Sequence, residues 1–128
     1  MSNTYGERRV VVTGVGAVSG FGKGANALWE GVKNGRSCVT RIRRIPTDEM
    51  TCKVAAEIFE FDPAPYVPAR QATQMDRFCH LGLWAASEAI DDAKLKIKDE
   101  DMFRIGAVTG TGIGGLDHYY SEARNLFE

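Results

Sequence analysis

The chain has 128 residues, of which 44% are hydrophobic and 26% charged, and its formal net charge is −1. This composition is typical of a soluble globular domain, and the near-neutral charge gives no indication of nucleic acid or an anionic membrane as a partner. No apolar run is long enough to cross a bilayer, and the opening residues MSNTYGERR lack the apolar stretch of a signal peptide. We therefore expect a cytoplasmic protein that has no membrane partner.

The first half of the chain predicts a strand, a glycine-rich loop and a helix. Residues 9–13 form an apolar run that is typical of a strand covered on both faces. Residues 14–24 contain the glycine-rich loop, and residues 26–34 (NALWEGVKN) have apolar side chains at helical spacing, with Gly35 as the expected C-cap. Residues 37–51 are basic and irregular.

The middle of the chain predicts a second strand and the longest helix. Residues 52–59 are expected to form the strand, and three prolines in residues 62–68 exclude long regular structure there. Residues 73–92 predict a helix, with Thr73 and Asp76 resembling a capping box. Because this helix is apolar on nearly every side, we expect it to be buried all round. Its small residues would let another element pack closely against it: Gly82, Ala85, Ala86 and Ala89.

The last part predicts a charged linker over residues 94–101, a third strand over residues 105–109 and a helix from residue 116 to residue 128. Three strands that feed glycine turns need a larger sheet to cover their edges and faces. We therefore expect the amino-terminal segment of a larger α/β protein. The alternative is a small α/β domain that ends in an exposed helix.

The two glycine-rich turns each resemble a phosphate-binding loop. A dinucleotide fingerprint requires G-x-G-x-x-G between a strand and a helix, followed by an acidic residue about twenty positions later. The first turn has Gly14 and Gly16 but Ser19 at the third position, whereas the second turn matches at Gly110, Gly112 and Gly115. In both turns glycine would also allow a positive φ and close packing between backbone segments. We favour this structural interpretation over phosphate binding.

The cysteines and histidines give little support for catalysis or metal binding. Cys38, Cys52 and Cys79 are odd in number and irregularly spaced, which suits neither a disulfide framework nor a metal site, and no cofactor is expected. Cys79 lies in the apolar helix, where free cysteine usually acts as a small hydrophobe. Its neighbour His80 points about 100° away on a helix, and His118 near the second turn is expected to be solvated or packed.

Four motifs carry a resemblance to a known family: RRVVVTGVGAVSGFG, LWEGVKNGRS, MDRFCHLGLWAASEAIDDA and RIGAVTGTGIGG. Taken in this order and with similar gaps, from about Arg8 to Gly115, they closely resemble the amino-terminal region of β-ketoacyl-acyl-carrier-protein synthases of the fatty-acid elongation type. Ketosynthases of polyketide assembly, and their non-condensing chain-length partners, share much of this region.

The resemblance implies a thiolase-like fold, in which two similar α/β halves enclose buried helices between two sheets and form a homodimer. Residues 1–128 would be the amino-terminal part of one ketosynthase domain, with no domain boundary inside the chain. The implied reaction is a decarboxylative condensation. A cysteine takes an acyl group from acyl carrier protein, malonyl on a second carrier loses CO₂, and the carbanion attacks the acyl thioester.

The family's nucleophilic cysteine and two histidines lie in later motifs. The resemblance therefore places no catalytic residue in this chain, and it predicts that the chain alone is inactive. It does place a substrate-binding residue here, because the family isoleucine that gates the acyl channel near the dimer interface corresponds to Ile113. The flanking Gly112 and Gly114 would let the backbone lie close to that channel.

The resemblance also implies a docking patch for the acidic carrier protein. Family members often carry several basic residues just before the MD-F motif. Here Arg70 keeps one basic position, Thr73 and Gln74 replace others, and Arg77 is new. We therefore expect docking to use Arg70 and Arg77, or to shift toward a second basic segment that contains Arg41, Arg43 and Arg44.

Three functions remain open from the sequence. The first is an elongating 3-oxoacyl-carrier-protein synthase that uses acyl and malonyl thioesters. The second is a non-condensing chain-length partner or a polyketide ketosynthase, which shares the same motifs. The third is a nicotinamide-dependent oxidoreductase, which would use the fingerprint at residues 110–115.

Overall fold

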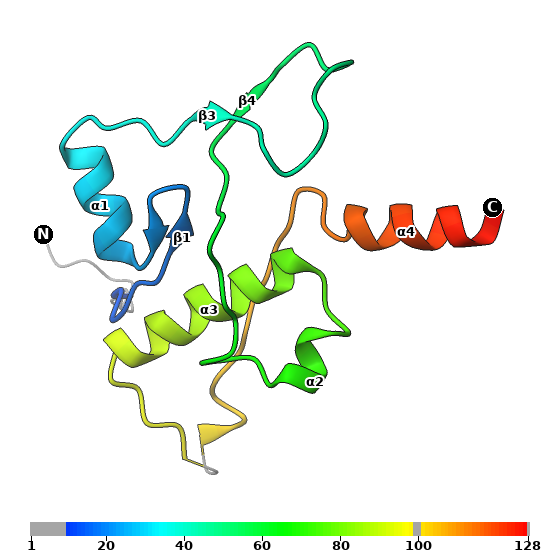
Figure 1. Ribbon diagram of the computed structural model, residues 1–128. Coiled ribbons are helices and arrows are strands. Elements are labelled where there is room, and N and C mark those ends of the chain that lie inside the picture. The colour runs from blue at the N-terminus through cyan, green and yellow to red at the C-terminus, as the bar shows by residue number, and fades with distance from the viewer. Residues whose placement is uncertain (1–9, 99–100, 128) are drawn as a thin grey trace, which may run out of the picture.

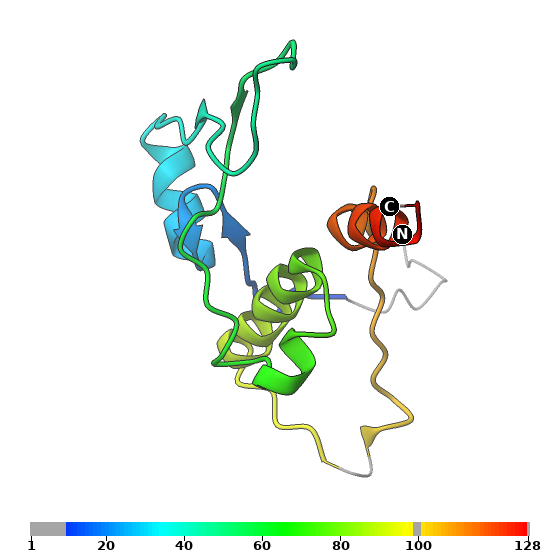
Figure 2. The same cartoon turned by 45° about the vertical axis from the view of Figure 1, so that its right-hand side comes forward.

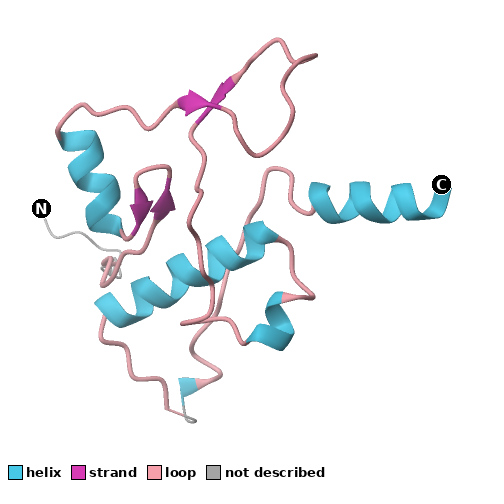
Figure 3. Ribbon diagram, viewed as in Figure 1, coloured by secondary structure: helices cyan, strands magenta, loops and turns pink. Residues whose placement is uncertain are grey.

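The computed structural model describes residues 10–98 and 101–127, and helix α3 is the longest element in this part of the chain (Figure 1). Loops connect short elements over most of the chain (Figure 3). In chain order the elements are β1 (Val18–Ser19), β2 (Gly22–Lys23), α1 (Ala25–Lys33), β3 (Thr40–Arg41), β4 (Val54–Ala55), α2 (Ala69–Ala72), α3 (Arg77–Asp92) and α4 (Leu116–Phe127).

The predicted first glycine loop contains a short β-hairpin. Strands β1 and β2 pair in antiparallel fashion, with Val18 opposite Lys23 and Ser19 opposite Gly22. Gly22 has a φ of +121°, and Gly24, which precedes α1, has a φ of +99°. Both values lie in the region that only glycine adopts readily. These glycines therefore turn the chain from the hairpin into α1.

The start of this loop packs backbone to backbone against α3. A Cβ atom added to Gly14 would overlap the carbonyl oxygen of Ala89, and one added to Gly16 would overlap the carbonyl oxygen of Ala85. Glycine at these positions and alanine on the helix therefore allow a close approach, as the small residues predicted. Gly82 takes no part, because an added Cβ there would meet no atom within 4 Å in the described part of the chain.

Two carboxylates of α3 fasten the same loop by hydrogen bonds. Glu88 accepts hydrogen bonds from the backbone N–H of Ala17 over 2.9 Å and of Ala25 over 3.0 Å. Asp92 accepts one from the backbone N–H of Val15 over 3.0 Å. Because Ala25 is the first residue of α1, the Glu88 carboxylate also lies at the positive end of that helix dipole. The first glycine turn is thus held at both ends by α3.

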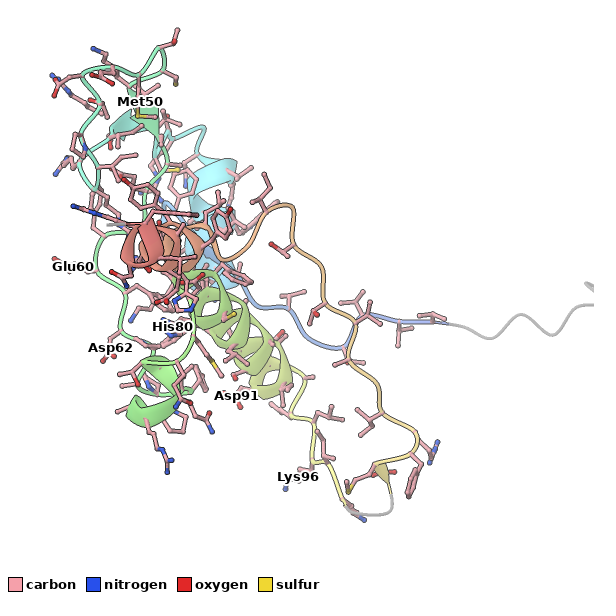
Figure 4. All side chains as sticks on the ribbon, turned by 90° about the vertical axis from the view of Figure 1, so that its right-hand side faces the viewer. Met50, Glu60, Asp62, His80, Asp91 and Lys96 are labelled. Carbon is pink, nitrogen blue, oxygen red and sulfur yellow. The ribbon has the colours of Figure 1, made fainter. Side chains whose placement is uncertain are left out.

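Replacement of Glu88 by glutamine should lower the free energy of unfolding by about 1.5–3 kcal/mol, because charge-assisted hydrogen bonds are lost and the amide N–H₂ group faces a backbone donor. Denaturant unfolding of the complete protein that contains this segment would measure the loss. Glu60→Gln is the matched control, since Glu60 is exposed (labelled in Figure 4). Equal stability of the two variants would contradict the bridging role.

The beginning of α3 differs from the prediction. The helix starts at Arg77, and Asp76 takes the N-cap position without a side-chain capping hydrogen bond. The Thr73 hydroxyl instead donates to the carbonyl oxygen of Arg70 over 2.9 Å, and Thr73 is the C-cap of the short helix α2. The predicted capping box is therefore wrong, because the threonine satisfies a carbonyl at the end of one helix rather than an N–H at the start of the next.

Only a fraction of the predicted strands forms. Strand β4 covers two of the residues predicted over 52–59, and β3 is a strand that the sequence did not predict. Residue 9 lies outside the described residues, and neither residues 10–13 nor residues 105–109 belong to a sheet in the described part of the chain. A strand needs a neighbour that accepts its ladder of hydrogen bonds, and apolar runs alone do not provide one.

The prediction that α3 is buried on all sides is wrong for this chain. Phe78, Leu83 and Ile90 remain 42%, 40% and 42% exposed, and Val67 is the only apolar side chain of the described part that is fully buried. Within the described ranges, no element covers the remaining faces of the helix. No helix among residues 10–98 and 101–127 is both long enough and apolar enough to cross a membrane.

A basic arm projects from the rest of the molecule (Figure 2). Strands β3 and β4 pair in antiparallel fashion, with Thr40 opposite Ala55, and the loop between them forms the arm. The Glu57 carboxylate accepts hydrogen bonds from the backbone N–H of Arg43 over 2.8 Å and of Arg44 over 3.2 Å. Figure 4 shows Met50 at the tip of this arm. The irregular, basic character predicted for the segment is confirmed outside β3.

An aromatic cluster fastens the proline-rich segment to α3. The Trp84 ring lies edge to face with Phe61 at 5.7 Å and with Tyr66 at 4.9 Å between centroids. Lys23 Nζ lies 4.5 Å from the centroid of the Trp84 ring. The Tyr66 hydroxyl donates to Asp91 over 2.9 Å, and this hydrogen bond raises the pKa of Tyr66. Residues 62–68 form no helix or strand, as predicted.

Candidate functional site

The second glycine loop, residues 110–115, lies against the amino-terminal end of α3. A Cβ atom added to Gly114 would meet the Phe78 ring at 2.7 Å, so this backbone passes directly over the ring. Gly115 has a φ of +78°, and an added Cβ there would lie 3.1 Å from Asp76 Oδ2. Two of the glycines are therefore explained by a close approach and by a left-handed backbone that favours glycine.

Ile113 occupies the outer side of this loop. Its side chain is 77% exposed. It lines a shallow cavity of about 160 Å³ together with Asp76, Arg77, Phe78, Gly115, Leu116 and Asp117. An apolar, branched side chain on a glycine-flanked turn can move without displacing a helix. The loop therefore presents an exposed apolar group at the edge of a cavity.

The flanking glycines of Ile113 differ in what surrounds them. A Cβ atom added to Gly112 would meet no atom within 4 Å in the described part of the chain, whereas Gly114 is restricted by Phe78. From the sequence, Gly115 was assigned only as the third glycine of the fingerprint, and Phe78 was not assigned to this site. The signal for Gly115 was its place directly before the last helix, where its carbonyl oxygen accepts a hydrogen bond from Tyr119 N–H over 2.9 Å.

Arg77 is held on several sides. Its guanidinium donates to the carbonyl oxygen of Ile58 and lies 5.7 Å from the centroid of the Phe61 ring. Burial lowers the pKa of Arg77, the neighbouring Arg44 lowers it further, and Asp117 acts in the opposite direction. The Arg77 side chain is half-buried, so part of it is shielded from solvent.

Arg70 has a different environment, because it lies on α2 and is exposed. Helix α2 is attached to α3 by a hydrogen bond between His80 Nε2 and the carbonyl oxygen of Ala72 over 3.0 Å. Beside this attachment, the connection from α2 to α3 faces the first turns of α4 across a cavity of about 430 Å³. Cys79 and His118 line this cavity, and no hydrogen bond joins them in the described part of the chain.

The charges at the second glycine loop disfavour a phosphate ligand. Asp117 lies in the first turn of α4, and Asp76 lies beside Gly115. Two carboxylates at this helix terminus would repel the phosphate that a dinucleotide fingerprint places there. No sheet strand precedes the loop in the described part of the chain. Likewise, no group of three or more His, Cys, Asp or Glu side chains among the described residues could hold a metal ion.

Comparison with known proteins identifies a family and relatives that agree with one another. Residues 7–127 match the family described as β-ketoacyl synthase, N-terminal domain. The 3-oxoacyl-[acyl-carrier-protein] synthase 2 of Synechocystis sp. is 39% identical over 110 residues, which is 86% of this chain and 26% of the relative. The enzyme of the same name from Staphylococcus aureus is 35% identical over 121 residues, which is 94% of this chain and 29% of the relative.

A solved structure agrees with these relatives. The ishigamide ketosynthase/chain length factor is 35% identical, with a TM-score of 0.61 over 70% of this chain and 22% of that chain. The chain thus spans between a quarter and a third of the length of the curated relatives named above. The similarity shows that the matched part of this chain has the fold of the corresponding part of that protein.

Proposed function

The chain belongs to the β-ketoacyl synthase family, and from this premise we propose that it is the amino-terminal segment of an elongating 3-oxoacyl-[acyl-carrier-protein] synthase. The proposal covers the thiolase-like α/β fold of the complete domain, a homodimer and a cytoplasmic location. It is supported by relatives of that name at 35–39% identity over most of the chain. The complete enzyme would condense an acyl thioester with malonyl on acyl carrier protein and release CO₂.

Within that enzyme, the proposed role of this segment is to control entry of the acyl chain. The observation that carries this proposal is the position of Ile113, exposed on a glycine loop at the mouth of a cavity beside Phe78. An acyl chain is recognised by apolar contact rather than by hydrogen bonds, and Ile113 offers such a contact. Arg70 and Arg77 are the proposed docking residues for the acidic carrier, with Arg70 the more exposed of the two.

A second candidate is a non-condensing partner that shapes the channel of a condensing dimer. The observation in its favour is the structural similarity to the ishigamide ketosynthase/chain length factor. The two candidates differ in the nucleophile, because only a condensing subunit carries the reactive cysteine. The third function, a nicotinamide-dependent oxidoreductase, is disfavoured by Asp76 and Asp117 at the second glycine loop.

A condensation assay tests the proposal. The complete protein should release CO₂ from malonyl-acyl carrier protein only when an acyl-carrier protein is also present, and should extend the acyl chain by two carbons. The 128-residue chain alone should show no release, because the resemblance places the nucleophile outside it. Mass spectrometry of the carrier-bound product measures the two-carbon extension, both for the complete protein and for the 128-residue chain. Absence of condensation by the complete protein, either alone or mixed with a condensing partner, would contradict both ketosynthase roles.

A further inference from the structure

Helix α2 carries the exposed docking arginine but buries none of its own residues. It spans only Ala69–Ala72, and Arg70 is exposed on it. The Arg70 guanidinium forms no hydrogen bond or ion pair with the other described residues, so it is available to a carboxylate of a partner. A helix of one turn is not stable by itself in water. The direction in which Arg70 points therefore depends on what holds α2 to the rest of the molecule.

Helix α2 is attached at each of its ends. Before its first residue, Val67 is 1% exposed, and the Val67 N–H donates to the carbonyl oxygen of Pro63 over 2.9 Å. At the other end, the carbonyl oxygen of Ala72 lies 3.0 Å from His80 Nε2 on α3, and Figure 4 shows His80 on the side of α3 toward α2. Met75 N–H approaches the same oxygen at 3.4 Å, so His80 makes the shorter bond.

The His80 ring acts as the hydrogen-bond donor in this attachment. A carbonyl oxygen can only accept a hydrogen bond, so Nε2 carries the proton. The last carbonyl groups of a helix lack partners within it, and a side chain from another element can supply one. His80 is half-buried, which limits the competition of water for this carbonyl oxygen. His80 therefore fixes the end of α2 two residues after Arg70.

We propose that His80 is a positioning residue, whose hydrogen bond to the Ala72 carbonyl oxygen fixes α2 so that Arg70 faces the acidic carrier protein. The inference rests on the proposed function, because it deepens the docking role of Arg70. His80 itself contacts neither the carrier protein nor the acyl chain. Without its hydrogen bond, α2 gains freedom at one end, and docking has to restrict that freedom again, which weakens carrier binding.

The test measures carrier binding and turnover by the complete protein. His80→Ala should raise the dissociation constant of acyl-carrier protein, measured by calorimetry, by roughly twofold to fivefold, which is the factor that one hydrogen bond or exposed ion pair contributes. The KM for the carrier substrate should rise by the same factor, while kcat stays unchanged. For an acyl thioester of N-acetylcysteamine, which has no carrier protein to dock, kcat/KM should also stay unchanged.

Two further substitutions test the hydrogen bond itself. The side-chain amide nitrogen of glutamine can take the place of His80 Nε2, whereas that of asparagine corresponds to Nδ1 and does not reach the Ala72 carbonyl oxygen. His80→Gln should therefore bind the carrier almost as the wild type does, and His80→Asn should resemble His80→Ala. If His80→Ala proves insoluble, the contrast between glutamine and asparagine still decides the question.

A double-mutant cycle connects His80 to Arg70. Arg70→Ala should raise the carrier dissociation constant at least as much as His80→Ala, because it removes the docking group itself. In the Arg70→Ala background, His80→Ala should add little, since the arginine that it positions is gone. His118→Ala is the matched control: the His118 imidazole is exposed and forms no hydrogen bond with the described residues, so carrier binding should not change.

The outcomes separate this inference from the proposed function. Unchanged carrier binding in His80→Ala, beside a clear loss in Arg70→Ala, would overturn the positioning role alone. Equal losses in His80→Gln and His80→Ala, full additivity with Arg70→Ala, or a fall in turnover of the N-acetylcysteamine thioester would indicate a general structural role and would also overturn it.

Failure of the wild type to condense would overturn the condensing function, but the calorimetric measurement of carrier binding would still decide the role of His80. A wild-type protein that does not bind the carrier would overturn the docking role of Arg70 and the positioning role of His80 together.

Discussion

Replacement of Gly16 by alanine should prevent the protein from reaching its stable fold. The added methyl group would overlap the carbonyl oxygen of Ala85 and would also lie 2.8 Å from the backbone nitrogen of Ala89. Because both atoms belong to the backbone of α3, no side-chain rotation relieves the overlap. The loop must move away, which also breaks the hydrogen bonds to Glu88 and Asp92. We expect a loss of about 3 kcal/mol or more.

Soluble yield and thermal unfolding of the complete protein would measure this effect. Gly82→Ala, on the helix that Gly16 packs against, is the control, since an added Cβ there meets open space in the described part of the chain. It should change stability by about 1 kcal/mol or less. Adding Ala85→Gly to Gly16→Ala should not restore stability, because the overlap is with a carbonyl oxygen rather than with a methyl group. Similar losses at Gly16 and Gly82 would refute the close-approach argument.

Replacement of Ile113 by phenylalanine should have the largest effect on activity. The larger ring would fill the mouth of the 160 Å³ cavity and restrict longer acyl chains, while short chains would be spared. Pockets that sort apolar substrates by size discriminate by roughly ten- to hundredfold, so kcat/KM for long chains should fall in this range. The measurement is a series of acyl-carrier proteins of increasing chain length, assayed with the complete synthase.

Ile113→Leu is the control for this variant, because it conserves volume and apolar character. It should leave the chain-length profile close to that of the wild type. Thermal unfolding should be nearly unchanged in both variants, since the Ile113 side chain is largely exposed in this segment. An unchanged profile in Ile113→Phe would refute the gate, and a uniform fall for all chain lengths would show a general effect on folding instead.

The helices were predictable because their evidence is local. Periodicity predicted a helix over residues 26–34, and α1 covers Ala25–Lys33. The end of α3 at Asp92 was also correct, whereas its start was placed too early. The reason is that the Thr73 hydroxyl donates to a carbonyl oxygen at the end of α2. The sequence does not tell whether a threonine hydroxyl bonds to the helix before it or to the helix after it. The strands depended on distant partners and were mostly wrong.

The site was predictable in part. The resemblance identified Ile113 and Gly114. In the structure Ile113 lines the 160 Å³ cavity and Gly114 lies against the Phe78 ring. The gating role of Ile113 itself stays a prediction. Glu88 was missed, since a glutamate within an apolar helix resembles an ordinary surface residue until its backbone partners are known. Asp117 was missed for the same reason, because its place at the cavity that Ile113 also lines follows from how α4 meets α3.

The attachment of the first glycine turn to α3 has a consequence for synthesis of the protein. The hydrogen bonds from Ala17 to Glu88 and from Val15 to Asp92 join residues that are 71 and 77 positions apart. On a ribosome that adds about 5–20 residues per second, roughly 4 to 15 seconds separate the emergence of the turn from that of its partner. During this interval the turn and the apolar run before it are exposed without the helix whose carboxylates later hold the turn. Chaperones that bind nascent apolar segments would therefore meet it first.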